Sequence, residues 1–392
     1  MINISGKHID SAVQIHYEAC SPIIEKKLNL IIDVFEVWIN SKQIKKTYSL
    51  QKYYGLHHNT IKTLINPLLN GKKRKRGKKY NISSNECESL LFSCQKNVLN
   101  KKITLDERKR CFKFFNQVKL DLKEILTSSP KLLSDKFITP LFYRDQTDPL
   151  IKKIIENIFS YEMLTGEGYK HPSRITNWTS YEFTLSTKIL VCPYCNKNWI
   201  NTVFDDQGEK ITNPQLDHFF CKSEFPILRL SFYNLIPSCE TCNVRIKKEA
   251  IFTYSDYLNP YVNGFENFSK FIARPKDTAS SEGVGNNYEI VLRNSLDKRD
   301  AQLVNKNINN YKFFKIKEIY ECHGDLISEI FFLKQKHGSR FLSTILRGDK
   351  FINMKIEEIY RMVFSNYYHE EDFNRRPFAK LIRDIVDDQM LI

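Results

Sequence analysis

Several features that define other protein classes are missing from this sequence of 392 residues. It has no apolar run of about 18 residues, so it offers no candidate transmembrane helix. Its first residues lack a basic stretch followed by an apolar block, so we expect no secretion signal and a cytoplasmic location. It also lacks a glycine-rich loop followed by Lys and Ser or Thr, so we expect no ATP site of its own.

Acidic residues are absent from residues 41–80, which contain twelve Lys or Arg. Seven of these form one basic block: Lys72, Lys73, Arg74, Lys75, Arg76, Lys78 and Lys79. Such blocks attract nucleic acid because binding to phosphates releases condensed counterions. The basic block is therefore a candidate nucleic-acid-binding segment. A solvated basic loop or a contact to an acidic partner protein would explain it as well.

The length allows two or three domains, and 42% hydrophobic residues is ordinary for a soluble globular protein. The periodicity predicts a mainly α-helical protein of the α+β class. We expect a helical, basic region over residues 1–100 and a helical connector over 101–185. A small metal-binding module should follow over 186–255, and a mostly helical region with a short strand pair over 256–392.

The basic N-terminal region contains a pattern that is typical of a helix-turn-helix. Residues 49–56 predict a short helix that ends at Gly55, and residues 59–65 predict a second helix capped by Asn59. In that arrangement the second helix could read DNA. An ordinary helical hairpin explains the same pattern nearly as well.

Four cysteines form two Cys-x-x-Cys pairs, which are separated by 43 residues: Cys192, Cys195, Cys239 and Cys242. Four thiolates are the usual ligand set of a closed structural zinc site. Paired spacing in a chain without a secretion signal favours zinc over disulfides. The gap is longer than in a simple zinc ribbon, so the intervening residues need an explanation. The alternative is a zinc knuckle whose only role is to stabilise a loop.

The intervening segment predicts a β-hairpin followed by a helix. Residues 199–204 are strand-like and 205–208 predict a turn, so we expect the return strand to carry Asp217 and His218. Neighbouring strand residues point to opposite faces, so these two side chains can serve different partners. Residues 238–248 can form a helix that packs against the hairpin.

Two asparagines complete the pattern, since Asn234 lies between the cysteine pairs and Asn243 directly follows Cys242. The order Cys-x-x-Cys, Asp-His, Asn and Cys-x-x-Cys-Asn resembles the HNH nuclease module, whose fold is the ββα-metal fold. The resemblance implies that His218 is the general base and that Asn234 bonds to the backbone and orients the loop. It also implies that Asp217 and Asn243 hold a catalytic magnesium or manganese ion, although many family members have His in place of this second asparagine.

These implied roles are chemically coherent. Phosphodiester hydrolysis needs a base for water and a cation that stabilises charge on the phosphate. A carboxylate and an amide oxygen suit magnesium, which prefers hard oxygen ligands. A histidine satisfied within the core is the alternative explanation of His218.

From about residue 188 onward the chain also resembles, more loosely, bacterial HNH proteins paired with ATPases in antiphage systems such as Septu and certain retrons. The resemblance therefore implies a DNA endonuclease that acts in antiphage defence with an ATPase partner. RNA, including transfer RNA, is the alternative substrate, because a water nucleophile needs no 2′-hydroxyl. A non-catalytic zinc module that binds nucleic acid or scaffolds an assembly is the alternative function. Residues 1–185 resemble no family that we recognise.

Overall fold

The structure is a computed structural model, and it describes residues 1–40, 50–69, 100, 102–265, 268–338 and 354–389. These residues are mainly helical with a few short strands, which is consistent with the predicted α+β class. The basic block, Lys72 to Lys79, lies outside the described residues. Within the described part of the chain, no helix is both long enough and apolar enough to cross a membrane.

The chain forms two compact units that interleave along the sequence. The helical unit consists of Asp10–Phe183 and Phe220–Leu235. The cysteine unit consists of Met1–Ile9, Thr184–Phe219 and Ile236–Ile392, and it contains all four paired cysteines. The four consecutive segments that the sequence predicts remain a prediction.

The described residues of the helical unit form mainly helices. They are α1 (Lys7–Asn40, within the unit from Asp10), α2 (Leu50–Tyr54), α3 (His58–Ile65), η1 (Asn66–Leu68), α5 (Leu105–Leu120), α6 (Leu122–Thr127), α7 (Pro130–Phe137), α8 (Pro140–Thr147), α9 (Pro149–Ile158), α10 (Tyr161–Thr165), η3 (Pro226–Leu228) and η4 (Phe232–Asn234). The helix α11 (Ser180–Thr187) begins in this unit and ends in the other.

Local sequence explains why α9 begins and packs where it does. Asp148 precedes it, and its Oδ1 accepts hydrogen bonds from the backbone N–H groups of Leu150 (3.0 Å) and Ile151 (3.2 Å). Pro149 occupies the first helical position. Proline has no backbone N–H, and an N–H at this position would have no partner within the helix. Four isoleucines at helical spacing then form its buried face: Ile151, Ile154, Ile155 and Ile158.

The two short helices expected around Gly55 are present as α2 and α3, and Gly55 itself has a φ of 60°. The prediction that Asn59 caps the second helix is wrong. The cap residue is His57, whose extended backbone precedes the helix and whose Nδ1 accepts from the N–H of Asn59 at 3.3 Å. The helix α3 buries Ile61, Leu64 and Ile65, and it packs against α9.

The cysteine unit combines short strands with helices. Its elements after α11 are β1 (Val203–Phe204), β2 (Lys210–Thr212), β3 (Gln215–His218), β4 (Leu235–Ser238, within the unit from Ile236), η5 (Thr241–Lys247), β5 (Ser269–Pro275), α12 (Thr278–Ser281), β6 (Tyr288–Asn294), η6 (Lys298–Asp300), α13 (Ala301–Phe313), α14 (Ile316–Glu321), α15 (Gly324–His337), α17 (Ile356–Phe364), η8 (Glu370–Arg375) and α18 (Ala379–Asp388).

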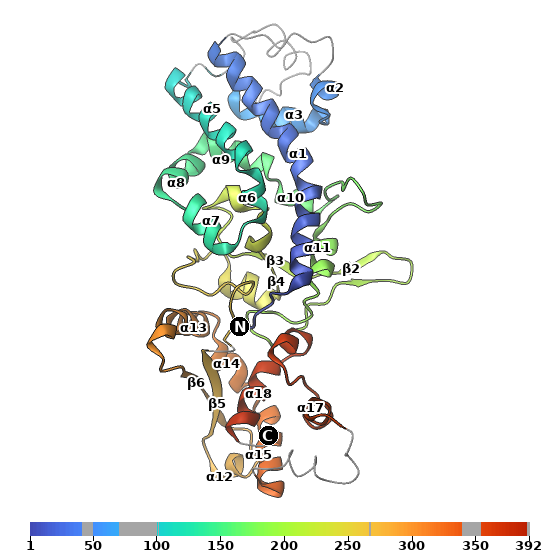
Figure 1. The fold of residues 1–392 in the computed structure, drawn as a ribbon, viewed down its shortest axis with the longest axis vertical. Helices are drawn as coiled ribbons and strands as arrows, with labels where there is room; N and C mark the ends of the chain where they lie inside the picture. The colour runs from blue at the N-terminus through green and yellow to red at the C-terminus, as the bar shows by residue number, and fades with distance from the viewer. Residues whose placement is uncertain (41–49, 70–99, 101, 266–267, 339–353, 390–392) are drawn as a thin grey trace, which may run out of the picture. The chain divides into compact units, whose positions relative to one another are not determined.

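The predicted short strand pair in the C-terminal region is confirmed as β5 and β6. They pair antiparallel from Ser269 opposite Asn294 to Pro275 opposite Tyr288. The helix α18 packs against β5, and α14 packs against β6 (Figure 1). A buried ion pair fixes α18, because Lys380 Nζ lies 2.7 Å from Asp384 Oδ2 and donates to the carbonyl oxygen of Ser269 at 3.0 Å.

The predicted β-hairpin is present in part, but its return strand is not the one expected. The strand β1 pairs antiparallel with β2, so the return strand ends at Thr212. Pro214 follows, and proline cannot donate a ladder hydrogen bond, so it separates β2 from β3. Asp217 and His218 therefore lie on β3, which pairs with β4 in a different sheet.

Candidate functional site

The four paired cysteines come together in the cysteine unit. Their Sγ atoms all lie within 4.8 Å of one another, and all four residues are buried. The two pairs meet where the Sγ atoms of Cys195 and Cys239 are 3.9 Å apart. This buried cluster of four thiols could hold a structural metal ion such as zinc, for which Cys₄ is a common ligand set.

A tight turn presents the first pair. The N–H of Cys192 donates to the carbonyl oxygen of Asn198 at 2.9 Å, and the N–H of Asn196 donates to the carbonyl oxygen of Cys192 at 2.8 Å. Asn196 has a φ of 48°, and asparagine is among the few residues that adopt this left-handed backbone readily. Its buried side chain is held in turn by Phe373 and Lys380.

The second pair lies where β4 leads into η5. The N–H of Asn243 donates to the carbonyl oxygen of Cys239 at 3.0 Å, which ties the start of η5 to the cysteines. At the other end of η5, the N–H of Lys248 donates to the carbonyl oxygen of Asn243 at 2.7 Å. That i to i+5 bond makes η5 a wide π-type turn, which is common at functional sites. Asn198 belongs to the turn that carries the first cysteine pair, and its Nδ2 donates to Cys239 Sγ at 3.2 Å.

The thiols do not share one environment. Burial raises the pKa of Cys192 well above its ordinary value. Hydrogen bonds from Cys192, Cys195 and Cys242 lower the pKa of the Cys239 thiol instead. A hydrogen bond with Cys192 also lowers the pKa of Cys195. The four thiols must lose their protons to bind a metal as thiolates, and a divalent cation would stabilise the resulting negative charges.

Asp217 is buried on β3, and both of its carboxylate oxygens have partners. Oδ1 lies 3.1 Å from Nζ of Lys247, and Oδ2 accepts a 2.5 Å hydrogen bond from the hydroxyl of Tyr194. Lys247 is equally buried and also donates to the backbone oxygen of His218 at 2.7 Å. Asp217 therefore balances a buried ammonium group, a role that its sequence motif alone does not indicate.

His218 follows Asp217 on β3, and 7% of it is exposed. Strand alternation directs its side chain away from the face of Asp217. Gln215 shares that Asp217 face, and its Oε1 accepts a hydrogen bond from Nδ2 of Asn243 at 3.1 Å. The structure thus brings Asn243 to β3 through Gln215, on the face that also carries Asp217.

Asn234 belongs to the helical unit, where it is fully buried. Its Oδ1 accepts from the N–H of Phe220 at 2.6 Å, and its Nδ2 donates to the carbonyl oxygens of Phe220 (3.2 Å) and Leu228 (2.9 Å). Both partners are backbone groups of the segment that follows β3 in the chain: Phe220 lies in the loop after β3, and Leu228 ends η3. Asn234 thus closes that loop two residues after His218.

Sequence reasoning missed Tyr194 and Lys247, whose side chains bond to the carboxylate of Asp217. A weak signal was present for each. Tyr194 stands inside the first Cys-x-x-Cys pair, and Lys247 follows Asn243 by four residues, which is about one helical turn. Neither signal was decisive, because lysine is rarely buried without a partner and the partner here is 30 residues away in the sequence.

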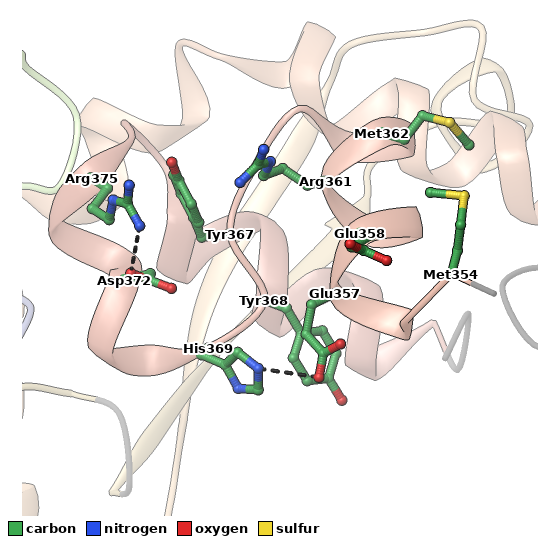
Figure 2. Close-up of a pocket in the computed structure, with 10 residues that line it drawn as sticks. All are labelled: Met354, Glu357, Glu358, Arg361, Met362, Tyr367, Tyr368, His369, Asp372 and Arg375. Atoms are coloured by element: carbon green, nitrogen blue, oxygen red, sulfur yellow. Dashed lines mark hydrogen bonds and ion pairs between the residues drawn. The ribbon is translucent and has the colours of Figure 1, made fainter.

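A large cavity of the cysteine unit contains none of the predicted site residues. It has a volume of about 750 Å³ and lies between α17 and η8 (Figure 2). Two contacts join charged or titratable side chains of its lining: Glu357 Oε1 lies 3.2 Å from His369 Nε2, and Asp372 Oδ1 lies 3.1 Å from Arg375 Nη1.

Comparisons of the chain with protein-family models, curated protein sequences and solved structures found no match.

Proposed function

We propose that the protein is a metal-dependent nuclease of the HNH type, with DNA as the preferred substrate. The main support is the combination of three features in the cysteine unit. The buried cysteine cluster could hold a structural metal ion. The strand β3 carries Asp217 and His218. The turn η5 carries Asn243, starts at the cluster and packs against β3.

In the proposed reaction, His218 takes a proton from a water molecule as the water oxygen attacks phosphorus. The bond from phosphorus to the leaving oxygen breaks, and solvent protonates that oxygen. Asp217 and Asn243 would hold a magnesium or manganese ion, which when bound stabilises negative charge on the phosphate. Their carboxylate and amide oxygens are donors of the kind that magnesium prefers. The ion would share the Asp217 carboxylate with Lys247, which contacts Oδ1, and with Tyr194, which donates to Oδ2.

The decisive experiment is incubation of purified, metal-analysed protein with plasmid DNA, single-stranded DNA and total RNA, each with magnesium, with manganese or with EDTA. We expect metal-dependent cleavage of DNA. A mock purification from cells that lack the protein is the control for contaminating nucleases. Cleavage of RNA but not of DNA would support the nuclease function and show that its substrate is RNA instead of DNA.

The absence of cleavage under all conditions would overturn the proposal, provided that the protein is folded and loaded with metal. The cysteine unit would then be a structural metal module that serves binding or assembly.

A further inference from the structure

The contacts around Asp217 suggest how the proposed catalytic pair is kept in place. Tyr194 binds Oδ2 from one side and Lys247 binds Oδ1 from another. Lys247 also binds the backbone oxygen of His218, so a single ammonium group joins the side chain of one residue to the main chain of the next. Rotation of the Asp217 side chain or a shift of β3 would break one or more of these bonds.

Both holding residues are themselves well packed. The ring of Tyr194 stacks on Phe314, with centroids 4.5 Å apart and an interplanar angle of 19°. Nζ of Lys247 lies 4.8 Å from the ring centroid of Phe252. A buried ion pair with hydrogen bonds on both partners resists rearrangement, because each charge left alone would be strongly destabilised.

The holding residues also belong to the two segments that carry the cysteines. Tyr194 lies between Cys192 and Cys195, and Lys247 is the last residue of η5, which contains Cys242. A metal ion that ties the two cysteine pairs together would therefore also fix the distance between Tyr194 and Lys247. Asp217 occupies the space between these two side chains.

We propose that Tyr194 and Lys247 are positioning residues that hold Asp217 and His218 and make their geometry depend on metal occupancy of the cysteine cluster. This inference deepens the proposed nuclease and rests on it for its catalytic consequence. The link itself is a property of the fold, so it can also be measured without any cleavage. Neither residue reacts with the substrate; both act through Asp217 and the backbone of His218.

The most selective variant is Tyr194→Phe, which removes the hydroxyl but keeps the ring that stacks on Phe314. A matched control exists in Tyr320→Phe. Tyr320 is also fully buried, and its hydroxyl donates to the carbonyl oxygen of Cys195 at 2.7 Å, so it supports the same turn without reaching Asp217. Tyr194 belongs to the cysteine turn, and Tyr320 contacts it from α14. Each variant removes one buried hydroxyl, and only Tyr194→Phe removes a hydrogen bond to Asp217.

In the cleavage assay we expect Tyr194→Phe to lower kcat by about tenfold at unchanged KM, whereas Tyr320→Phe should stay within about twofold when rates are expressed per metal-loaded protein. Equal decreases of kcat in both variants would show that the turn matters only for folding, and that outcome would overturn the positioning role. Unchanged kcat in Tyr194→Phe would overturn it as well.

A second measurement does not depend on nuclease activity. Zinc-loaded wild type, Tyr194→Phe, Asp217→Asn and the double variant are mixed with excess EDTA, and the rate of zinc release is followed. We expect each single variant to release zinc severalfold faster, and the double variant to be no faster than the faster single variant, because both changes break the same link. Multiplicative rates in the double variant would refute the link, whatever the cleavage assay shows. If the zinc-release rates are non-additive but the wild type cleaves no nucleic acid, the link is supported and only the proposed nuclease function is refuted.

Discussion

The indole N–H of Trp178 donates to Nδ1 of His16 at 2.9 Å, inside the helical unit. Because Trp can only donate, this bond leaves the proton of the neutral imidazole on Nε2, which donates to the carbonyl oxygen of Leu230 at 2.7 Å. The neutral ring therefore satisfies both of its nitrogens. Protonation of Nδ1 would place its N–H opposite the indole N–H of Trp178, so that two donors face each other in a site that water does not reach.

This arrangement predicts a decrease in stability at mildly acidic pH. Burial lowers the pKa of His16 from 6.5 to about 4. The unfolded state therefore binds a proton more readily, so the contribution of His16 is complete above pH 6.5 and is lost as the pH falls towards 4. The decrease should approach about 3 kcal/mol, at 1.36 kcal/mol per pKa unit. Denaturant unfolding followed by tryptophan fluorescence between pH 7.5 and about 4 measures it.

The control is His16→Gln, which keeps an acceptor and a donor but cannot gain a proton in this range. It should be less stable than wild type at pH 7, with a smaller decrease in stability on acidification. Equal pH dependence in the two proteins would mean that other groups are responsible.

The buried pair of Lys380 and Asp384 predicts a strong dependence of the cysteine unit on one carboxylate. Asp384 also accepts from the backbone N–H of Phe271 at 2.8 Å, so it connects α18 to β5. Asp384→Ala should lower the free energy of unfolding by about 3–5 kcal/mol, because it leaves a buried ammonium group unpaired. The exposed pair Lys317 and Glu289 is the comparison, and Lys317→Ala should destabilise the protein far less, because solvent screens an exposed ion pair. Thermal unfolding of both variants tests this; equal destabilisation would contradict it.

The sequence predicted features that depend on local spacing and missed those that depend on distant partners. The cysteine pairs could be found because each pair is a short local motif, and the strand pair β5 and β6 because each strand alternates locally. The partner of a strand is different: nothing local indicates that β3 pairs with β4 rather than with β1. The same limit hid the pairing of Asp217 with Lys247. It also hid the interleaving of the two units, since packing between distant segments leaves no periodic signal.

The cysteine cluster predicts about one zinc ion per chain, which elemental analysis of freshly purified protein measures. Replacing Cys192, Cys195, Cys239 or Cys242 with Ser should abolish zinc binding and destabilise the cysteine unit. The effect should be large, because zinc binding is coupled to folding with apparent values of roughly 10–16 kcal/mol in zinc-finger peptides. Cys322→Ser is the control, since Cys322 is exposed and donates only to the carbonyl oxygen of Glu318. Folded wild-type protein without zinc would contradict the assignment.

The basic block, Lys72 to Lys79, predicts a salt-dependent contribution to nucleic-acid binding, although it lies outside the described residues. Replacing its Lys and Arg with Glu should weaken binding to every DNA sequence. Removing one bound phosphate from the interface should reduce the slope of log K against log salt by about 0.9 on duplex DNA. Fluorescence anisotropy at several salt concentrations measures the slope. An unchanged slope together with weaker binding to a protein partner would identify the block as a protein-docking segment.

The proposed nuclease makes its sharpest prediction at His218. His218→Ala should lower cleavage by about 10²–10⁴-fold, because the base for water is removed while zinc content and folding remain. Asp217→Ala and Asn243→Ala should also abolish cleavage, but excess magnesium or manganese should partly rescue a weakened ligand set and should not replace a missing base. Asn243→His should keep activity, and Asn234→Ala should be milder, since Asn234 bonds to the backbone of the segment that follows β3. Full cleavage by His218→Ala, in a preparation free of contaminating nuclease, would reduce the site to a structural metal module.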